Sequence, residues 1–298
     1  MGEMLIWREK TRHWSEKIEK WKWIIAMILG AVVMAPAYAQ SMHSTTALAN
    51  GATASSAYSG SSLWFQRDNV PGVGTQRLSA IRMGPNWGIA PAHAFDVGNN
   101  FRIGNGSNYF SDPGITANVT SFVTHPLAVP GTFTGTEVDL AVFFWDTALP
   151  GTNLTIAPVV LNEVLSYVGY GRPATPGLGL MAPDGQRRLF QTYADAFGAP
   201  IAGVSSDYVV GPFHPSGAQF LTLGGCGTSG GSGSGVYNQS GQPVAMLVAG
   251  SGSPGYFAST YSLRFDLYSP WIDTIVPTPA SATVLAFGGI FAFKRRRK

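Results

Sequence analysis

Short apolar runs separated by turn-forming residues constrain the fold of this chain more than any other feature of its sequence. Before the last stretch of the chain, no run with helical periodicity is longer than about three turns. We expect strands at the apolar runs 63–65, 138–145, 155–161, 167–170 and 244–248. Glycine-containing turn signals occur between such runs, at 112–114, 183–185 and 240–242. Short strands at this spacing are typical of an all-β sandwich or barrel.

One helix is predicted in this domain, over residues 266–275, where Pro270 fits a first helical turn. Cys226 is the only cysteine, so an intrachain disulfide is impossible and the fold depends on its apolar core. Residues 40–275 form a stretch long enough for one large all-β domain or a unit of two barrels.

The first 39 residues have the pattern of a secretory signal peptide. Residues 1–22 are charged, residues 23–36 are apolar, and residues 37–39 read Ala-Tyr-Ala, a small-x-small cleavage pattern. A membrane anchor is the alternative, but the apolar run is shorter than the roughly 20 residues that span a bilayer. Cleavage is expected after residue 39. Residues 40–60 are rich in Ser, Thr, Ala and Gly, which predicts a flexible mature N-terminus.

The other end, residues 276–298, combines a Pro-x-Pro motif, a short apolar stretch and five basic residues at 294–298. It resembles a variant of the bacterial PEP-CTERM sorting signal, which implies a sorting and processing machinery as a partner. The positive-inside rule keeps such a basic tail in the cytoplasm, and a simple tail anchor is the alternative. We therefore expect export across the inner membrane, with transient membrane contact through both termini. The folded part would lie in the cell envelope, at the surface or outside the cell.

The basic character of the chain belongs to its two ends. The formal net charge is +3, but the part between the ends carries eight arginines, no lysine and twelve acidic residues. A nucleic-acid footprint needs clustered basic residues on the domain, so we expect no nucleic-acid partner. The sequence contains no metal-binding cluster and no nucleotide-binding loop, so neither a metal nor another cofactor is expected.

Three short segments carry the chemistry that the sequence offers. His93 follows the apolar segment 87–92, Asp139 stands at the start of an apolar run, and Ser232 lies in the glycine-rich segment 224–235. A serine hydroxyl is a poor nucleophile unless a neutral imidazole takes its proton and a carboxylate holds that imidazole in the right tautomer. His93 and Asp139 are 46 residues apart, and Asp139 and Ser232 are 93 residues apart.

Each of these residues has a competing interpretation. Glu137 is an alternative acid in a different strand register, and Ser229 is an alternative nucleophile in the local Thr-Ser-Gly-Gly context. The glycine-rich segment is alternatively a flexible linker without chemistry. The other histidines that follow the signal peptide are expected at non-catalytic positions: His43 in the flexible start, His125 in a turn, and His214 in an exposed loop.

The order His, Asp, Ser with gaps of this size resembles the chymotrypsin/trypsin family of serine proteases, over about residues 61–275. The resemblance implies two six-stranded antiparallel Greek-key barrels with a short C-terminal helix, and a secreted or surface-sorted serine endopeptidase. It implies that His93, Asp139 and Ser232 form the catalytic triad, and that the N–H groups of Gly230 and Ser232 form the oxyanion hole. The floor of the substrate pocket would be Cys226.

The chain departs from the family where Gly231 replaces the usual acid before the nucleophile. The departure implies that a salt bridge to a newly released N-terminus does not activate this protein, so the loop is either preformed or inactive. An inactive trypsin-fold domain that serves as a surface binding or matrix protein is therefore the alternative function, and a Gly/Ser-rich adhesin is a third. No acidic residue lies between Asp207 and Asp266, so no preference for Arg or Lys is expected, and a small or apolar substrate side chain is favoured.

Overall fold

The computed structural model describes residues 40–129, 136–198, 204–251 and 255–276. The predicted signal peptide (1–39) lies outside the described residues, as does all but the first residue of the predicted sorting segment (276–298). Within the described ranges, no helix has both the length and the apolar character needed to cross a bilayer.

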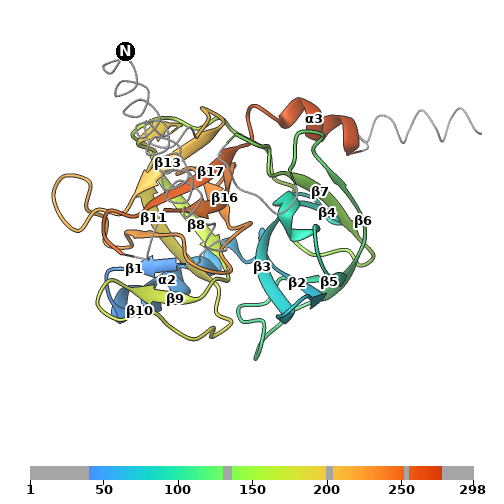
Figure 1. Cartoon of the computed structure of the whole chain (residues 1–298), viewed down its shortest axis with the longest axis horizontal. Helices are drawn as coiled ribbons and strands as arrows, with labels where there is room; N and C mark the ends of the chain where they lie inside the picture. The colour runs from blue at the N-terminus through green and yellow to red at the C-terminus, as the bar shows by residue number, and fades with distance from the viewer. Residues whose placement is uncertain (1–39, 130–135, 199–203, 252–254, 277–298) are drawn as a thin grey trace, which may run out of the picture. The chain divides into compact units, whose positions relative to one another are not determined.

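Six antiparallel strands close a barrel in the first lobe, in the order β2-β3-β4-β7-β6-β5 (Figure 1). Each strand is short and buries apolar side chains inside the barrel, as expected from the sequence pattern. The barrel core includes Phe65, Leu78 and Phe143. The strands are β2 (Ser62–Val70), β3 (Gly74–Arg82), β4 (Trp87–Ala90), β5 (Asn99–Gly104), β6 (Thr116–Thr124) and β7 (Ala141–Trp145).

The second lobe contains a seven-stranded antiparallel sheet in the order β11-β8-β15-β16-β17-β13-β12. Its strands are β8 (Val164–Gly169), β11 (Arg188–Tyr193), β12 (Ala196–Phe197), β13 (Tyr208–Pro212), β15 (Gly235–Tyr237), β16 (Pro243–Gly250) and β17 (Ser259–Arg264). A four-stranded sheet in the order β10-β9-β1-β14 accompanies it. Its strands are β1 (Gln40–Met42), β9 (Pro173–Thr175), β10 (Gly179–Leu180) and β14 (Gly225–Cys226).

The predicted fold class is confirmed: the domain is all-β, with a closed six-stranded barrel and a short C-terminal helix. That helix, α3 (Ser269–Ile275), has Pro270 in its first turn, where the missing N–H of proline needs no helical partner. The second lobe differs in detail from a six-stranded barrel, since its main sheet has seven strands. Glycines of the three predicted turns, Gly114, Gly185 and Gly241, all have positive φ.

The expectation of a flexible segment over residues 40–60 is wrong. This stretch forms strand β1, helix α2 (Thr45–Ala54) and a 3₁₀ turn, η1 (Ser55–Tyr58). The hydroxyl of Ser44 accepts a hydrogen bond from the N–H of Ala47 and so caps α2. Met42, Ala47 and Leu48 are buried in the core of the second lobe. The small side chains that suggest flexibility allow the helix to pack closely. At Gly51, for example, a Cβ would collide with the carbonyl oxygen of Leu189.

The strand predicted over residues 155–161 is absent from the structure. Pro158 lies in the middle of this segment and has no N–H to donate to a neighbouring strand. One backbone hydrogen bond, from the N–H of Ala157 to the carbonyl oxygen of Pro243, still joins the segment to the second lobe. Ala157 and Val159 are buried there, which accounts for the apolar character of the run.

A third apolar cluster joins the two lobes beneath the segments that carry the predicted catalytic residues. Ile89 of β4 and Leu140 before β7 come from the first lobe, whereas Met246 and Val248 of β16 come from the second. Ile272 of helix α3 belongs to the same cluster. All of these side chains are nearly inaccessible to solvent. Such close packing holds the ends of β4 and β7, next to which His93 and Asp139 lie.

Candidate active site

The register of two barrel strands brings His93 and Asp139 together. Ala90, the last residue of β4, pairs with Ala141, the first residue of β7. His93 lies three residues beyond β4 in the 3₁₀ turn η2 (Ala92–Ala94), and Asp139 lies two residues before β7. The two segments therefore meet at the same end of the strand pair, although 46 residues separate them in the sequence.

Asp139 holds the imidazole at two points. Its Oδ2 lies 2.6 Å from Nδ1 of His93, and its Oδ1 accepts a hydrogen bond of 2.9 Å from the backbone N–H of the same histidine. The Asp139 side chain is 10 % exposed and the His93 side chain 26 % exposed. A buried carboxylate is costly unless it is paired, and here both of its oxygens have a donor. With Nδ1 engaged, Nε2 makes no hydrogen bond within the described residues and is left to face a reactant.

Two consecutive turns shape the loop that contains Ser232. The N–H of Gly231 donates to the carbonyl oxygen of Thr228 at 3.1 Å, and the N–H of Ser234 donates to that of Gly231 at 2.9 Å. The third residue of each turn, Gly230 and Gly233, has a φ of 87°. A type II turn requires positive φ at this position, which glycine adopts without strain. The glycine-rich segment is therefore an ordered loop and not a linker.

Strand β3, strand β16 and Pro91 surround this loop. The carbonyl oxygen of Ser232 accepts a hydrogen bond of 2.8 Å from the N–H of Ser79 on β3. The N–H of Gly233 donates to the carbonyl oxygen of Leu247 on β16, also at 2.8 Å. A Cβ on Gly233 would lie 3.1 Å from the ring of Pro91, two residues before His93. The loop that contains Ser232 thus lies directly against the start of the histidine turn.

The hydroxyl of Ser232 is bonded to a backbone carbonyl group in this structure. Its Oγ donates to the carbonyl oxygen of Val248 at 3.3 Å, and the residue is 0 % exposed. No hydrogen bond between Ser232 and His93 is present among the described residues. A change of the serine χ1 angle between staggered positions moves Oγ without moving the backbone. Long or misaligned hydrogen bonds between catalytic groups are common in the absence of substrate.

The backbone N–H groups of Gly230 and Ser232 are the donors predicted for the oxyanion hole. Neither donates to any atom of the residues that the structure describes. Three other residues of the loop, Gly231, Gly233 and Ser234, each donate their N–H to a carbonyl oxygen. Two N–H groups without an acceptor, one on Ser232 itself and one on Gly230, can bind an oxygen that gains negative charge.

A buried arginine, Arg67, binds the backbone of His93. Its Nη1 donates to the carbonyl oxygen of His93 at 2.6 Å, while its Nε and Nη2 both donate to the side-chain oxygen of Gln76, at 2.9 and 2.6 Å. Arg67 is 6 % exposed. The sequence does not predict this role, because an arginine in the middle of an amphipathic strand gives no sign that its side chain turns inward.

Opposing effects set the pKa of His93. Burial disfavours the imidazolium and lowers the pKa, and the positive charge of Arg67 acts in the same direction. The charge of Asp139 and its hydrogen bond favour the imidazolium, with a smaller contribution from Asp96. The carboxylates prevail, so the pKa of His93 is raised above its ordinary value of 6.5. The base form of the imidazole therefore predominates only at a higher pH than for a free histidine.

The alternatives to these residues occupy other positions. Ser229 is half-buried, and its carbonyl oxygen accepts a hydrogen bond from the N–H of Arg172. Glu137 is buried, and its carbonyl oxygen accepts from the hydroxyl of Tyr208 at 2.7 Å; it is Asp139 that reaches the imidazole.

Cys226, the predicted pocket floor, is almost fully buried beside β1, with its Sγ 3.9 Å from the carbonyl oxygen of Gly255. Burial raises the pKa of its thiol to about 12.

The remaining histidines of the described domain have other contacts. His125 packs edge-on against Tyr268 and Trp271, and so joins the first lobe to the C-terminal segment. His43 is not in a flexible start, as predicted, but lies among Phe213, Phe220 and Tyr256. His214 is half-buried rather than in an exposed loop, and its Nε2 is buried without a hydrogen-bond partner in the described structure. None of the three contacts Asp139 or Ser232 through an interaction seen here.

Comparison with solved structures identifies the fold. The mouse brain serine protease neuropsin matches with a TM-score of 0.55 at 13 % sequence identity, over 73 % of this chain and 94 % of that one. The scabies mite inactivated protease paralogue S-I1 matches with a TM-score of 0.54 at 14 % identity, over 72 % of this chain and 92 % of that one. No protein-family model and no curated protein sequence matches this chain. The chain has the fold of the trypsin-like serine proteases, and these two matches are a serine protease and an inactivated protease paralogue.

Proposed function

We propose that this protein is a serine endopeptidase that hydrolyses peptide bonds with Ser232 as nucleophile, His93 as general base and Asp139 as the group that orients the histidine. The observation that carries the proposal is the double hold of Asp139 on His93, with Nε2 unengaged. An aspartate that only stabilised the loop would not need to bind Nδ1 of the imidazole. The trypsin-like fold supports the proposal at the level of architecture.

In the proposed reaction, Nε2 of His93 takes the proton of the Ser232 hydroxyl as Oγ attacks the carbonyl carbon of the scissile bond. The carbonyl oxygen becomes negatively charged, and the N–H groups of Gly230 and Ser232 stabilise it. His93 then gives its proton to the departing amine, which leaves an acyl group on Ser232. A water molecule, deprotonated by the same imidazole, hydrolyses this ester and restores the serine.

A fluorophosphonate probe tests the proposal, because it modifies a serine only when that serine is activated. We expect a stoichiometric adduct that maps to the peptide containing Ser232. Ser229→Ala is the matched control: it removes a hydroxyl from the same loop and should leave the adduct unchanged. A folded protein that takes no label, or a label that maps to Ser229, would contradict this assignment.

A second candidate function is a catalytically inactive trypsin-fold domain that binds a partner at the surface or in a matrix. It is favoured by the position of the Ser232 hydroxyl, which is buried and bonded to the carbonyl oxygen of Val248. The similarity to an inactivated protease paralogue supports the same reading of the fold. Absence of labelling in a folded protein would select this function.

The setting of the proposed enzyme follows from its sequence. The apolar segment before residue 40 and the Pro-x-Pro, apolar and basic segments after residue 275 support export and sorting to the cell envelope, the surface or the exterior. Protein or peptide substrates with a small or apolar side chain at the Cys226 pocket are proposed, because no acidic residue lies between Asp207 and Asp266.

A further inference from the structure

An arginine on β3 lies next to the proposed oxyanion hole. Arg77 is two residues before Ser79, which holds the carbonyl oxygen of Ser232. The carbonyl oxygen of Arg77 is 3.3 Å from the position of a Cβ built on Gly230. Its guanidinium carbon lies 4.8 Å from the ring centre of Tyr109 and 5.2 Å from that of Phe110. The aromatic rings hold the long side chain in one direction, which lowers the entropy lost on binding a ligand.

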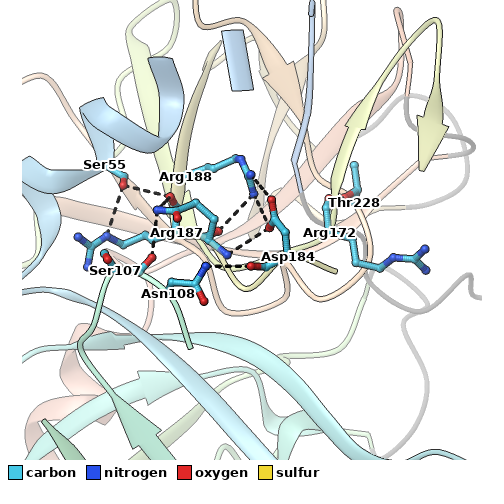
Figure 2. A network of polar contacts seen from close by, with 9 residues as sticks. Ser55, Ser107, Asn108, Arg172, Asp184, Arg187, Arg188 and Thr228 are labelled. Atoms are coloured by element: carbon cyan, nitrogen blue, oxygen red, sulfur yellow. Dashed lines mark hydrogen bonds and ion pairs between the residues drawn. The ribbon is translucent and has the colours of Figure 1, made fainter. Parts of the chain in front are cut away.

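A second arginine, Arg172, lies next to the loop that contains Gly230 and Ser232. The backbone of Arg172 is fixed by two hydrogen bonds: its N–H donates to Ser229 at 2.9 Å, and its carbonyl oxygen accepts from the hydroxyl of Thr228 at 2.6 Å. The preceding residue, Gly171, lies 3.6 Å from the same Cβ position on Gly230. Figure 2 shows the guanidinium of Arg172 directed away from Asp184, where its Nε donates to the carbonyl oxygen of Met181.

The charges around these two arginines are unbalanced. Asp184 is the acidic residue of the network in Figure 2, and both of its carboxylate oxygens bind Arg188. Neither Arg77 nor Arg172 forms an ion pair within the residues that the structure describes. Burial raises the pKa of the Tyr109 hydroxyl, and the charges of Arg77 and Arg172 both act to lower it, so both cations lie within electrostatic reach of that ring.

We propose that Arg77 and Arg172 form a subsite for a carboxylate of the substrate, on the leaving-group side of the scissile bond. This proposal rests on the proposed function for its direction: with the acyl side chain in the pocket at Cys226, the departing chain passes Gly230 toward Arg77. The ligand is a short peptide that carries either an acidic side chain or its own C-terminal carboxylate just beyond the scissile bond. Guanidinium groups bind carboxylates through two parallel hydrogen bonds, which gives the subsite its selectivity.

Binding to the Ser232→Ala protein tests the subsite without any need for catalysis. The probes are fluorescent alanine hexapeptides that contain one Glu or one Gln, with blocked ends, and a matching all-alanine peptide with a free or an amidated C-terminus. We expect the Glu peptide to bind about two- to fivefold more tightly than the Gln peptide, the range expected for a half-exposed ion pair. The two peptide pairs distinguish a side-chain carboxylate from a terminal one.

Substitutions assign the effect to the two arginines. Arg77→Gln and Arg172→Gln should each reduce the preference for Glu, whereas Arg77→Lys, which keeps the charge, should retain part of it. Arg102→Gln is the matched control, since Arg102 lies on β5 in an ion pair with Asp68. The preference should also weaken as salt is raised, because surface charges are screened. Circular dichroism confirms that each variant is folded.

Equal affinity within both peptide pairs, including failure to bind any of the peptides, would overturn the subsite, as would an equal effect of Arg102→Gln. Fluorophosphonate labelling of the wild-type protein separates this result from the fate of the proposed function. A labelled protein without a preference for Glu loses only the subsite. An unlabelled protein with the preference keeps the subsite as part of a binding protein.

Discussion

The two halves of the candidate site are built in different ways. His93 and Asp139 are placed by the pairing of β4 with β7, so a ladder of backbone hydrogen bonds determines their separation. Ser232 is placed by two turns whose geometry depends on Gly230 and Gly233. A sheet register tolerates changes of side chain, whereas a turn that needs positive φ does not. The structure of the histidine half should therefore tolerate single substitutions. The serine half should be sensitive to substitution of the two glycines with positive φ.

The largest expected effect comes from removing the nucleophile. Ser232→Ala should reduce hydrolysis of an unstructured protein substrate by about 10⁵- to 10⁶-fold, because it removes the hydroxyl that forms the proposed acyl intermediate. Ser229→Ala should retain activity. The measurement is the release of soluble peptides from the substrate over time. Full activity in Ser232→Ala with loss in Ser229→Ala would move the nucleophile to the other turn.

In the histidine half, Asp139→Asn keeps the size of the side chain but changes the tautomer of His93. We expect a loss of about 10⁴-fold in kcat with little change in thermal unfolding. Glu137→Gln is the matched control, because the carboxylate of Glu137 is two residues away and does not bind the imidazole. Equal losses in the two variants would show that the structure assigns the wrong acid.

The serine half should be the one that a single methyl group disrupts. In Gly233→Ala, the new Cβ would lie 1.8 Å from the carbonyl oxygen of Ser79 at a positive φ, and we expect a destabilisation of about 3–5 kcal/mol. Gly241 also has positive φ, but a Cβ there meets nothing within 4 Å, so Gly241→Ala should cost about 1 kcal/mol. Chemical denaturation of both variants measures the difference. Similar losses would mean that strain alone, without the contact between the lobes, accounts for the effect.

The pH dependence sharpens the account of the histidine half. Because the pKa of His93 is raised above 6.5, the rate should increase with pH through a midpoint above that value, as the base form appears. Protonated His93 stabilises the folded state; this contribution is complete below pH 6.5 and is lost as the pH rises through the raised folded-state pKa. Arg67→Met removes a charge that lowers this pKa, so the midpoint should move to higher pH. An unchanged midpoint would leave Arg67 with a purely structural role.

Much of the fold was predictable, because the period and length of the apolar runs reflect the pleat of short strands. The neighbourhood of His93 and Asp139 followed from motifs at the ends of two such runs. The prediction failed for residues 40–60, where the small residues that suggest a flexible segment also permit a closely packed helix. It failed again at 155–161, where an apolar run with a proline is buried without joining a sheet.

The arginines around the site illustrate a second limit. Arg67 and Arg77 lie on β2 and β3, where the sequence pattern predicts only a strand with some polar positions. The inward turn of Arg67 depends on Gln76 and on a carbonyl group that is 26 residues away in the chain. Arg172 reaches the loop through contacts with residues more than fifty positions later. Such long-range partners leave no local signal in one sequence.

The central claim is that His93 and Asp139 activate Ser232 as a unit, and the rate of fluorophosphonate modification at Ser232 tests it most directly. The wild-type protein should form an adduct on the peptide containing Ser232, with a rate that falls at least a thousandfold in His93→Ala, about the scale seen when a triad residue is removed. Mass spectrometry of the digested protein reports both the site and the rate. Modification at another serine, or the same rate in the wild type and in His93→Ala, would contradict the account.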